Sequence, residues 1–489
     1  MTGQHPRSSR GPGAGEHSPQ RAVEQALAAA RCDDCIVIAE ETSSANLRWA
    51  GNTLTTNGVS QGHRLTVIAV RRHGDGQTSA GVVSRSGVRE DQVADVVRAA
   101  ETAAGDASPA EDAMPLLDPG SPQAFPGGST RPCGTGWDDP VRHTEIGVFR
   151  DFTPALGQAF EQAAGQEQKL YGYAEHSLDC AFLGTSTGLR LRHDQPSGKV
   201  ELNAKSADLR RSSWGGVASR DFTDVDVAAL HASLARRLDW GQRRVELPAG
   251  RYETLLPPGA LADLLIYLYW SAGARDALDG RTVFSKPGGG TRVGEQLSPL
   301  PVTLRSDPVA AGLECAPFTV AHASGRDQSV FDNGLALRPT AWISDGTLAA
   351  LEQTRHTSGV TGLPASPAID NLIFESSAPD QPSLEDMLAR TQRGLLVTCL
   401  WYIREVDPQT LLLTGLTRDG VYLVENGEVT GEVNNFRFNE SPVGMLGRLA
   451  EVGASVRALP REWNDHFTRA AMPPVRVEGF NMSSVSQAS

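Results

Sequence analysis

The stretch LADLLIYLYWSAGARDALDG, Leu261–Gly280, decides how the second half of the chain folds. It follows Pro257 and Pro258, and proline is well tolerated in the first turn of a helix, where its missing N–H has no intrahelical partner. The run Leu264–Trp270 then predicts a helix that is apolar on every side. Such a helix must be buried, so we expect residues 258–279 to be clamped against a β-sheet or barrel.

Around that helix, residues 246–489 predict a mainly antiparallel β domain. The turn signals DNG, SDG, RDG and ENG occur at close spacing between short apolar runs. One further helix, SLEDMLARTQ, opens with a capping-box-like pattern of Ser383 and Asp386.

The N-terminal half predicts two α+β units. Residues 21–104 show helical periodicity, then strands separated by GN, NG and GDG, then a second helix. Residues 141–245 show the same order of helix, strands and helix. This order is compatible with an internal repeat of the architecture. Residues 105–140 are dense in Pro, Gly, Ser and Asp and predict a linker or long loop, and residues 1–20 predict a disordered tail. The predicted class is therefore α+β: an N-terminal α/β region of helices and antiparallel strands, then a β-rich domain with a buried helix.

Composition narrows the choice of partners. The chain of 489 residues has a formal net charge of −13, which argues against nucleic acid or an anionic membrane as partner. The run Leu264–Trp270 falls far short of the roughly 20 apolar residues that cross a bilayer, and the N-terminus has no apolar signal segment. We therefore expect a cytoplasmic protein.

Catalytic signatures are scarce. The sequence contains no HExxH, HExxxH, P-loop or GxGxxG pattern, and the serines of GTSTG and LPASPAID have no base nearby in the sequence. No histidine occurs between His231 and His322, and His356 stands alone. Cys32 and Cys35 form CDDC, but a second pair for a zinc site is missing, so we interpret them as thiols at the edge of a core and leave their role open.

Two polar stretches are candidates for a substrate cleft. WYIREVDP places Arg404 next to aromatic residues, and NNFRFNES alternates aromatic with polar side chains. In a strand, Phe436 and Phe438 share one face, and the other face carries Asn435, Arg437 and Asn439. An ordinary half-buried strand explains this pattern equally; the functional interpretation is a polar face that lines a cleft or binds a peptide by β-pairing.

Several segments, in a shared order, resemble the TldD/PmbA family of cytoplasmic metallopeptidases, whose members pair as TldD-type and TldE (PmbA)-type subunits. They are EETSSANLRWAGNTLTTNG, the helix ending in LDG, SVFDNGLALRPTAWISDGTL, RTQRGLLVTCL, LTGLTRDGVYLVENGEV and MPPVRVEGF. In TldD-type members the helix carries HExxxH with two zinc-binding histidines; the matching residues, Ser271–Asp276, read SAGARD. The third ligand, a cysteine near the C-terminus, has no counterpart after Cys399.

The resemblance thus implies a non-catalytic TldE-like subunit without metal, which pairs with a zinc-bearing TldD-type subunit and shapes a chamber for peptide substrates. For the cleft we predict Arg404, Asn435, Arg437 and Asn439, and no catalytic or metal-binding residue in this chain. Two alternatives stay open. One is an autonomous peptide hydrolase that uses His356 with Glu352 or a recruited serine. The other is a homo-oligomeric protein that binds peptides without cutting them.

Overall fold

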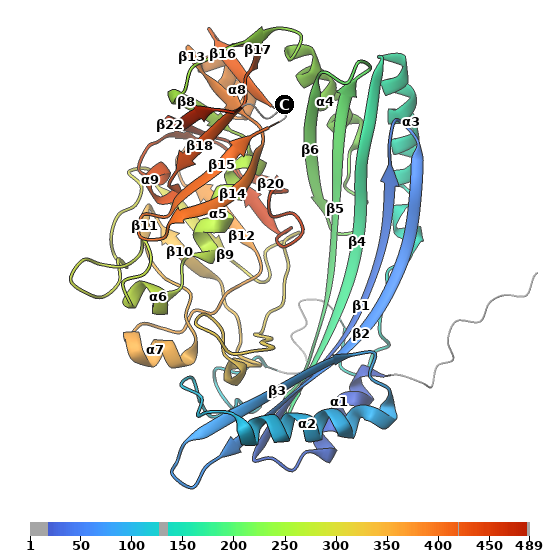
Figure 1. Ribbon diagram of the computed structural model, residues 1–489, viewed down its shortest axis with the longest axis vertical. Coiled ribbons are helices and arrows are strands. Elements are labelled where there is room, and N and C mark those ends of the chain that lie inside the picture. The colour runs from blue at the N-terminus through green and yellow to red at the C-terminus, as the bar shows by residue number, and fades with distance from the viewer. Residues whose placement is uncertain (1–17, 127–134, 419, 487–489) are drawn as a thin grey trace, which may run out of the picture.

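The computed structural model describes residues 18–126, 135–418 and 420–486, which form two lobes (Figure 1). The disordered tail predicted for residues 1–20 falls almost entirely on residues 1–17, which lie outside the described residues. The first helix begins directly after them, at Pro19.

A single six-stranded antiparallel sheet, in the order β3-β2-β1-β4-β5-β6, forms the N-terminal lobe. Its elements are α1 (Pro19–Ala29), β1 (Asp34–Trp49), β2 (Leu54–Arg72), β3 (Thr78–Ser86), α2 (Val93–Asp106), α3 (Phe152–Gly165), β4 (Gln168–Thr185), β5 (Arg190–Ser206), β6 (Ser212–Ser219) and α4 (Val227–Trp240), with 3-10 turns at Glu90–Gln92 and Ile146–Phe149.

The segments 21–104 and 141–245, predicted as two units, share this sheet. Strand β1 pairs with β4 from Ile36–Thr185 to Trp49–Gly172. Each segment supplies a helix, three strands and a second helix. In both segments the first strand lies at the centre of the sheet, the second beside it and the third at the edge.

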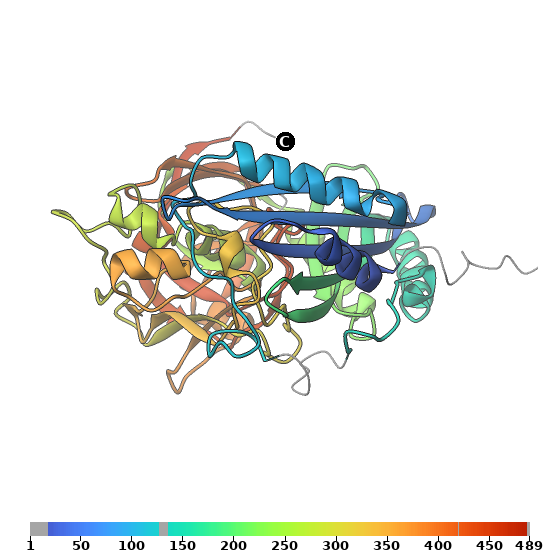
Figure 2. The same ribbon diagram turned by 90° about the horizontal axis from the view of Figure 1, so that it is seen from below.

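All four helices cover one face of the sheet. On β1, Val37 packs in a cluster with α1 and α2, and Leu47, on the same side of the strand, packs with α3 and α4. Figure 2 shows α1 and α2 lying against the sheet. The opposite side carries Ile36, which packs against Phe331 of the C-terminal lobe. The sheet is therefore held between its own helices and the second lobe.

Two mostly antiparallel sheets build the C-terminal lobe. The larger runs β14-β15-β18-β22-β8-β13-β16-β17-β7, with β19 paired to β22, and the smaller runs β11-β10-β9-β12-β21-β20. The elements are β7 (Arg244–Val245), β8 (Gly250–Leu256), α5 (Pro258–Trp270), α6 (Ala274–Leu278), β9 (Val302–Ser306), a 3-10 turn (Val330–Asp332), β10 (Thr340–Ser344), β11 (Thr347–Leu348), α7 (Arg355–Thr361), β12 (Leu372–Ser376), α8 (Leu384–Arg390), β13 (Arg393–Val397), β14 (Leu400–Asp407), β15 (Leu412–Thr417), β16 (Val421–Glu425), β17 (Glu428–Val433), β18 (Phe436–Glu440), α9 (Pro442–Leu446), β19 (Leu449–Val452), β20 (Val456–Ala458), β21 (Ala470–Met472) and β22 (Val475–Val485).

These observations confirm the α+β class. The predicted capping box is also present: the Ser383 hydroxyl accepts from the Asp386 N–H, and the Asp386 carboxylate accepts from the Ser383 N–H.

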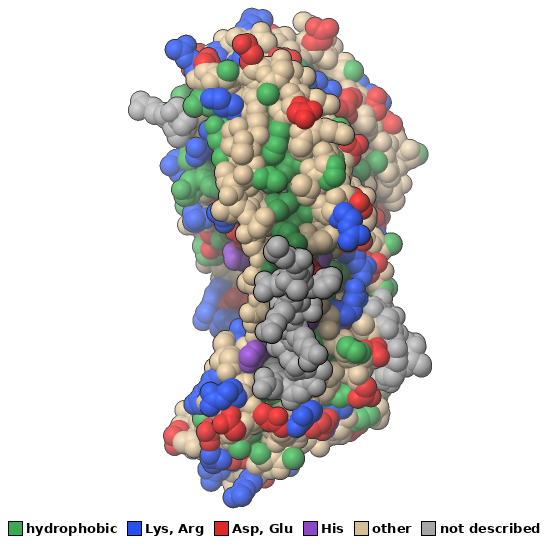
Figure 3. All heavy atoms as spheres, turned by 90° about the vertical axis from the view of Figure 1, so that its right-hand side faces the viewer, with side chains coloured by type: hydrophobic (Ala, Val, Ile, Leu, Met, Phe, Trp, Pro, Cys, Tyr) green, Lys and Arg blue, Asp and Glu red, His purple; other side chains and the backbone are tan. Residues whose placement is uncertain are grey.

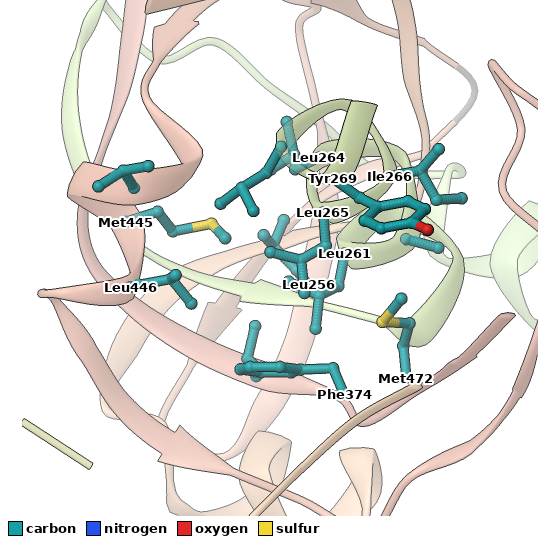
Figure 4. Packing of buried hydrophobic residues seen from close by; sticks show 14 of the residues in the cluster. Leu256, Leu261, Leu264, Leu265, Ile266, Tyr269, Phe374, Met445, Leu446 and Met472 are labelled. Atoms are coloured by element: carbon teal, nitrogen blue, oxygen red, sulfur yellow. The ribbon is translucent and has the colours of Figure 1, made fainter. Parts of the chain in front are cut away.

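Helix α5 lies at the centre of the C-terminal core (Figure 4). Its Leu264, Leu265 and Ile266 have no exposed area. Phe374 of β12 and Met445 of α9 pack in the same cluster. The predicted buried helix is thus confirmed.

The helix is shorter than predicted. It ends at Trp270, a separate turn α6 follows, and Trp270 remains 40% exposed. The chain leaves the helix here because the backbone pairs with another segment: Ala274 N–H donates to the Glu352 carbonyl and Glu352 N–H to the Ala272 carbonyl, both at 2.8 Å. Among the described residues no helix is long and apolar enough to cross a membrane.

Candidate functional site

The segment after α5, Ser271–Asp276, is closed rather than open to a ligand. Gly273 forms a bridge with Glu352, and a Cβ built on Gly273 would lie 2.3 Å from Oδ1 of Asp327. No side chain fits at this position without displacing Asp327.

The residues present here do not fit a zinc ion. Zinc in proteins takes thiolate, imidazole or carboxylate ligands, usually three or four from the chain. Within residues 18–126, 135–418 and 420–486, no group of three His, Cys, Asp or Glu side chains is placed to hold a metal ion. Asp276 and Asp279, the carboxylates of α6 and its end, instead form ion pairs with Arg326.

We predict that Gly273→Ala destabilises the chain by about 1–3 kcal/mol, because the new methyl group forces Asp327 to move. Thermal unfolding measures the effect. Gly359→Ala in α7 is the matched control, since nothing lies within 4 Å of its added Cβ. Adding Asp327→Ala to Gly273→Ala should restore part of the loss. Equal stability of Gly273→Ala and the unmodified chain would show that the contact is not tight.

Buried acids surround this segment. Glu352 is 6% exposed, and its Oε1 has no hydrogen-bond partner among the residues that the structure describes. Burial, reinforced by the nearby Asp327 carboxylate, raises the pKa of Glu352 to about 8. Burial likewise raises the pKa of Asp327, with Asp276 adding to the effect. Tyr269 lies beside Glu352, and burial raises the pKa of its hydroxyl as well. At neutral pH Glu352 is therefore mostly protonated and a poor general base.

Asp263 is an acidic residue inside α5 for which the sequence predicted no role. It has no exposed area, and burial raises the pKa of its carboxyl well above the usual range. Its Oδ1 accepts from the Glu462 N–H at 2.9 Å, and its carbonyl accepts from the Trp463 indole N–H at 2.8 Å. Asp263 therefore fixes the loop that follows β20. The signal for this role in the sequence is that Asp263 is the single acidic residue in an otherwise apolar helix.

That loop reaches across to the N-terminal sheet. Lys199 of β5 is 5% exposed; its ammonium group donates to Oδ1 of Asn464 at 2.6 Å and forms an ion pair with Asp465. Arg469 donates to the Ser197 hydroxyl at 2.8 Å. Strand β20 also lies against β6. Asp263 thus connects the core of one lobe to the face of the other.

A cavity of about 240 Å³ lies between the lobes at this junction. Its lining is polar and mixed in charge, and consists of Glu175, Ser177, Asp179, Ser197, Gly198, Lys199, Asn464, Asp465, His466, Thr468 and Arg469. Burial, with repulsion from Glu40, raises the pKa of Asp179. The cavity offers donors and acceptors to a polar backbone such as a peptide, and it was not predicted, because its lining comes from strands and a loop far apart in the sequence.

Three of the four predicted cleft residues, Arg404, Arg437 and Asn439, lie on one face of the sheet formed by β14, β15 and β18. Arg404 of β14 is opposite Thr414 of β15, which is opposite Asn439 of β18, and Arg437 lies two residues before Asn439. Asn435 is close to the same ladder, since its Oδ1 accepts from the Thr417 hydroxyl at 3.4 Å. These residues do not line the cavity at Lys199, and their role stays a prediction.

The alternation in NNFRFNES is as predicted: Phe436 and Phe438 have no exposed area, and Arg437 is exposed. Strand β18 pairs with β15 on one side and with β22 on the other. The prediction that this strand binds a peptide by β-pairing is therefore wrong, because both edges of the strand are already paired.

His356 and Glu352 do not form a catalytic pair. His356 lies in α7, its Nε2 is buried without a hydrogen-bond partner, and no hydrogen bond or ion pair joins it to Glu352 among the described side chains. The alternative of a relocated site at these two residues has no geometric support.

Cys32 and Cys35 lie where α1 gives way to β1. Cys35 is 1% exposed in the core under α1 and α2, and Cys32 packs at its edge. Their mutual hydrogen bond lowers the pKa of Cys32 and raises that of Cys35.

The fold and the segment after α5 define a two-lobed α+β protein with buried acidic side chains near the end of its central helix. Residues 249–484 match the family model of the PmbA/TldA metallopeptidase C-terminal domain. These residues therefore form a C-terminal domain of the PmbA/TldD type. No curated protein matches the chain at the level of sequence.

Solved structures share the fold over nearly the whole chain. TldE from Thermococcus kodakarensis superposes with a TM-score of 0.74 at 16% identity, covering 94% of this chain and 98% of that one. A putative modulator of DNA gyrase from Bacteroides thetaiotaomicron gives 0.74 at 14% identity, with 96% and 98% covered. Another putative modulator of DNA gyrase, from Thermotoga maritima, gives 0.69 at 16% identity, with 92% and 95% covered.

Proposed function

We propose that this chain is the metal-free, TldE-like subunit of a heterodimeric zinc metallopeptidase. A TldD-type subunit supplies the zinc ion and the general base, and both subunits enclose the peptide. The observation that carries the proposal is the end of α5: the place of the zinc motif is taken by SAGARD, and a side chain at Gly273 would displace Asp327.

Zinc hydrolysis requires three protein ligands, an open coordination position for water and a base beside that water. Glu352, whose backbone pairs with Ala272 and Ala274 after α5, is buried and mostly protonated at neutral pH. It therefore suits a structural role better than proton transfer.

The contribution of this chain is to shape the substrate chamber. The side of the N-terminal sheet away from its helices carries Thr42, Ser44 and Asn46 on β1 next to Ser177 and Asp179 on β4. This polar wall continues into the cavity at Lys199. A polar surface of mixed charge offers donors and acceptors to a peptide backbone. On the C-terminal lobe we assign a second wall to Arg404, Asn435, Arg437 and Asn439, and we place the complex in the cytoplasm.

Metal content and peptidase activity of the purified chain test the proposal. Alone, the chain should hold no stoichiometric zinc and cleave no peptide; mixed with a TldD-type subunit, it should support cleavage that EDTA abolishes. Zinc retention together with cleavage by the isolated chain would overturn the proposal.

A further inference from the structure

The corner between α1 and β1 contains a pair of cysteines that the proposed function does not use. Cys32 and Cys35 enclose two aspartates in the sequence CDDC. Both side chains pack in the cluster beneath α1 and α2. A hydrogen bond joins the two thiols, so their sulfur atoms are neighbours in the folded chain. Two intervening residues are also the spacing found in redox-active cysteine pairs.

The folded chain holds this corner from three sides. The Cys32 N–H donates to the Glu101 carboxylate of α2 at 3.0 Å. The Cys35 N–H donates to the Ser186 hydroxyl, directly after β4, at 3.0 Å. Both aspartates between the cysteines bind Arg72 of β2, one at its backbone N–H and the other at its guanidinium. Because the surrounding elements already position the two cysteines, joining their sulfur atoms orders the chain very little.

The two thiols differ in their access to solvent. Of the five cysteines in the part of the chain that the structure describes, Cys32 alone is not buried. Cys35 is 1% exposed. The hydrogen bond between them lowers the pKa of Cys32 and raises the pKa of Cys35. Since the thiolate is the reactive form of cysteine, Cys32 is the thiol that meets a reagent first, and Cys35 lies behind it.

Neither isolated burial nor a metal ion accounts for the pair. Cys180 and Cys315 each stand far from any other cysteine in the sequence, and burial raises the pKa of each thiol to about 12. Cys32 departs from that behaviour. No group of three His, Cys, Asp or Glu side chains that the structure places could hold a metal ion, so the two thiols are not half of a zinc site.

The surroundings of the pair are polar. Figure 1 draws α1 and α2 at the lower end of the molecule, and Figure 3 shows Lys, Arg, Asp and Glu side chains gathered at that end. Arg31 and Asp33, on either side of Cys32, are both exposed. Exposed apolar patches mark sites where proteins bind each other. A charged surface of this kind suits a small, water-soluble reagent instead.

We propose that Cys32 and Cys35 are a redox-active pair, which a low-molecular-weight disulfide oxidises to an intramolecular disulfide. The Cys32 thiolate attacks one sulfur of the reagent, forms a mixed disulfide and expels the first thiolate. The Cys35 thiol then gives its proton to water, and its sulfur attacks that of Cys32 and expels the second thiolate. The two cysteines together lose two electrons and two protons, and the reagent is reduced to two thiols.

Both steps are reversible when reduced thiol is in excess. In the reducing cytoplasm that we propose for this chain, a disulfide of this kind forms only transiently and responds to the balance between small thiols and their disulfides. The corner then acts as a modification site whose state follows that balance.

Glutathione buffers and mass spectrometry of the full chain test the proposal. Trypsin releases residues 32–48 as one peptide, which contains Cys32, Cys35 and no other cysteine. The folded chain is equilibrated with rising fractions of glutathione disulfide, quenched, unfolded, labelled with N-ethylmaleimide and digested. We expect this peptide to change, in one two-electron transition, from doubly labelled to unlabelled and lighter by two hydrogen atoms. Residues 170–190, which contain Cys180, are the control and should be labelled throughout.

Two variants separate the roles of the cysteines. In Cys35→Ala the second sulfur is missing, so Cys32 should stop at the mixed disulfide with glutathione. Loss of the hydrogen bond should also slow alkylation of Cys32 at neutral pH by about threefold or more. In Cys32→Ala the buried Cys35 should stay unmodified. Circular dichroism confirms that both variants fold, and the titration of the unmodified chain tests the proposal without them.

Three results would overturn the proposal. They are retention of both thiols across the whole series, a glutathione adduct that accumulates on Cys32 of the unmodified chain, and a disulfide that forms only in urea. The inference is independent of the proposed function, because Cys32 and Cys35 have no part in the metallopeptidase proposal. Failure of either one leaves the other standing.

Discussion

Replacing Arg192 by leucine is expected to lower the free energy of unfolding by about 3–5 kcal/mol, because it leaves a buried carboxylate without its partner. The Arg192 and Asp194 side chains are each 1% exposed and join through two hydrogen bonds, at 2.8 and 3.0 Å. The guanidinium also donates to the carbonyls of Gly136, Asp139 and Pro140 and lies 4.8 Å from the centre of the Phe182 ring.

Urea unfolding followed by circular dichroism measures this loss. The control is Arg210→Leu, whose pair with Asp208 is 4.0 Å long and exposed, and whose cost should stay within about 0.5 kcal/mol. Adding Asp194→Leu to Arg192→Leu removes the unpaired charge and should recover part of the loss. If Arg192→Leu behaved like Arg210→Leu, the buried pair would not hold the sheet to residues 136–140.

Glu352→Gln is expected to stabilise the chain increasingly as the pH rises. The folded-state pKa of about 8 exceeds the ordinary value of 4.5, so between these values the folded state binds more protons than the unfolded state. Stability of the unmodified chain therefore falls from pH 4.5 towards pH 8. The rise in pKa corresponds to roughly 5 kcal/mol once the pH exceeds 8. Glutamine does not ionise, so the variant escapes this loss.

Denaturant midpoints at pH 5 and pH 8.5 are the measurement for this variant. At pH 5 the two chains should be nearly equal in stability, and at pH 8.5 the variant should be the more stable by several kcal/mol. Glu428→Gln, an exposed carboxyl on β17, is the control and should shift neither midpoint. A gain for Glu352→Gln of equal size at both pH values would mean that packing, not ionisation, is responsible.

Local sequence patterns predicted the features that depend on a few neighbouring residues. The apolar run Leu264–Trp270 predicted a buried helix, and Leu264 through Ile266 are buried. Gly51 and Asn52, read as a turn signal, adopt positive φ between β1 and β2. The alternation around Arg437 predicted a half-buried strand. Each result follows from burial or backbone preference within one element.

One local turn signal gave a wrong prediction because the pairing of β1 with β2 outweighed it. Asn57-Gly58 was read as a turn, yet both residues lie inside β2, opposite Leu47 and Asn46. The ladder with β1 continues on both sides of them, and the hydrogen bonds of a long strand pair outweigh the preference of two residues for a turn.

The sequence by itself determined the α+β class, the burial of α5, the lack of histidine across residues 232–321 and the resemblance to the TldD/PmbA family. Only the tertiary structure decided that β1 joins β4 in one sheet, that Gly273 is packed against Asp327, that Asp263 fixes the loop after β20, and that one edge of β2 is open. The physical reason is the same in each case: these features depend on contacts between residues far apart in the chain, and local propensity does not record which distant segment completes a ladder or fills a space.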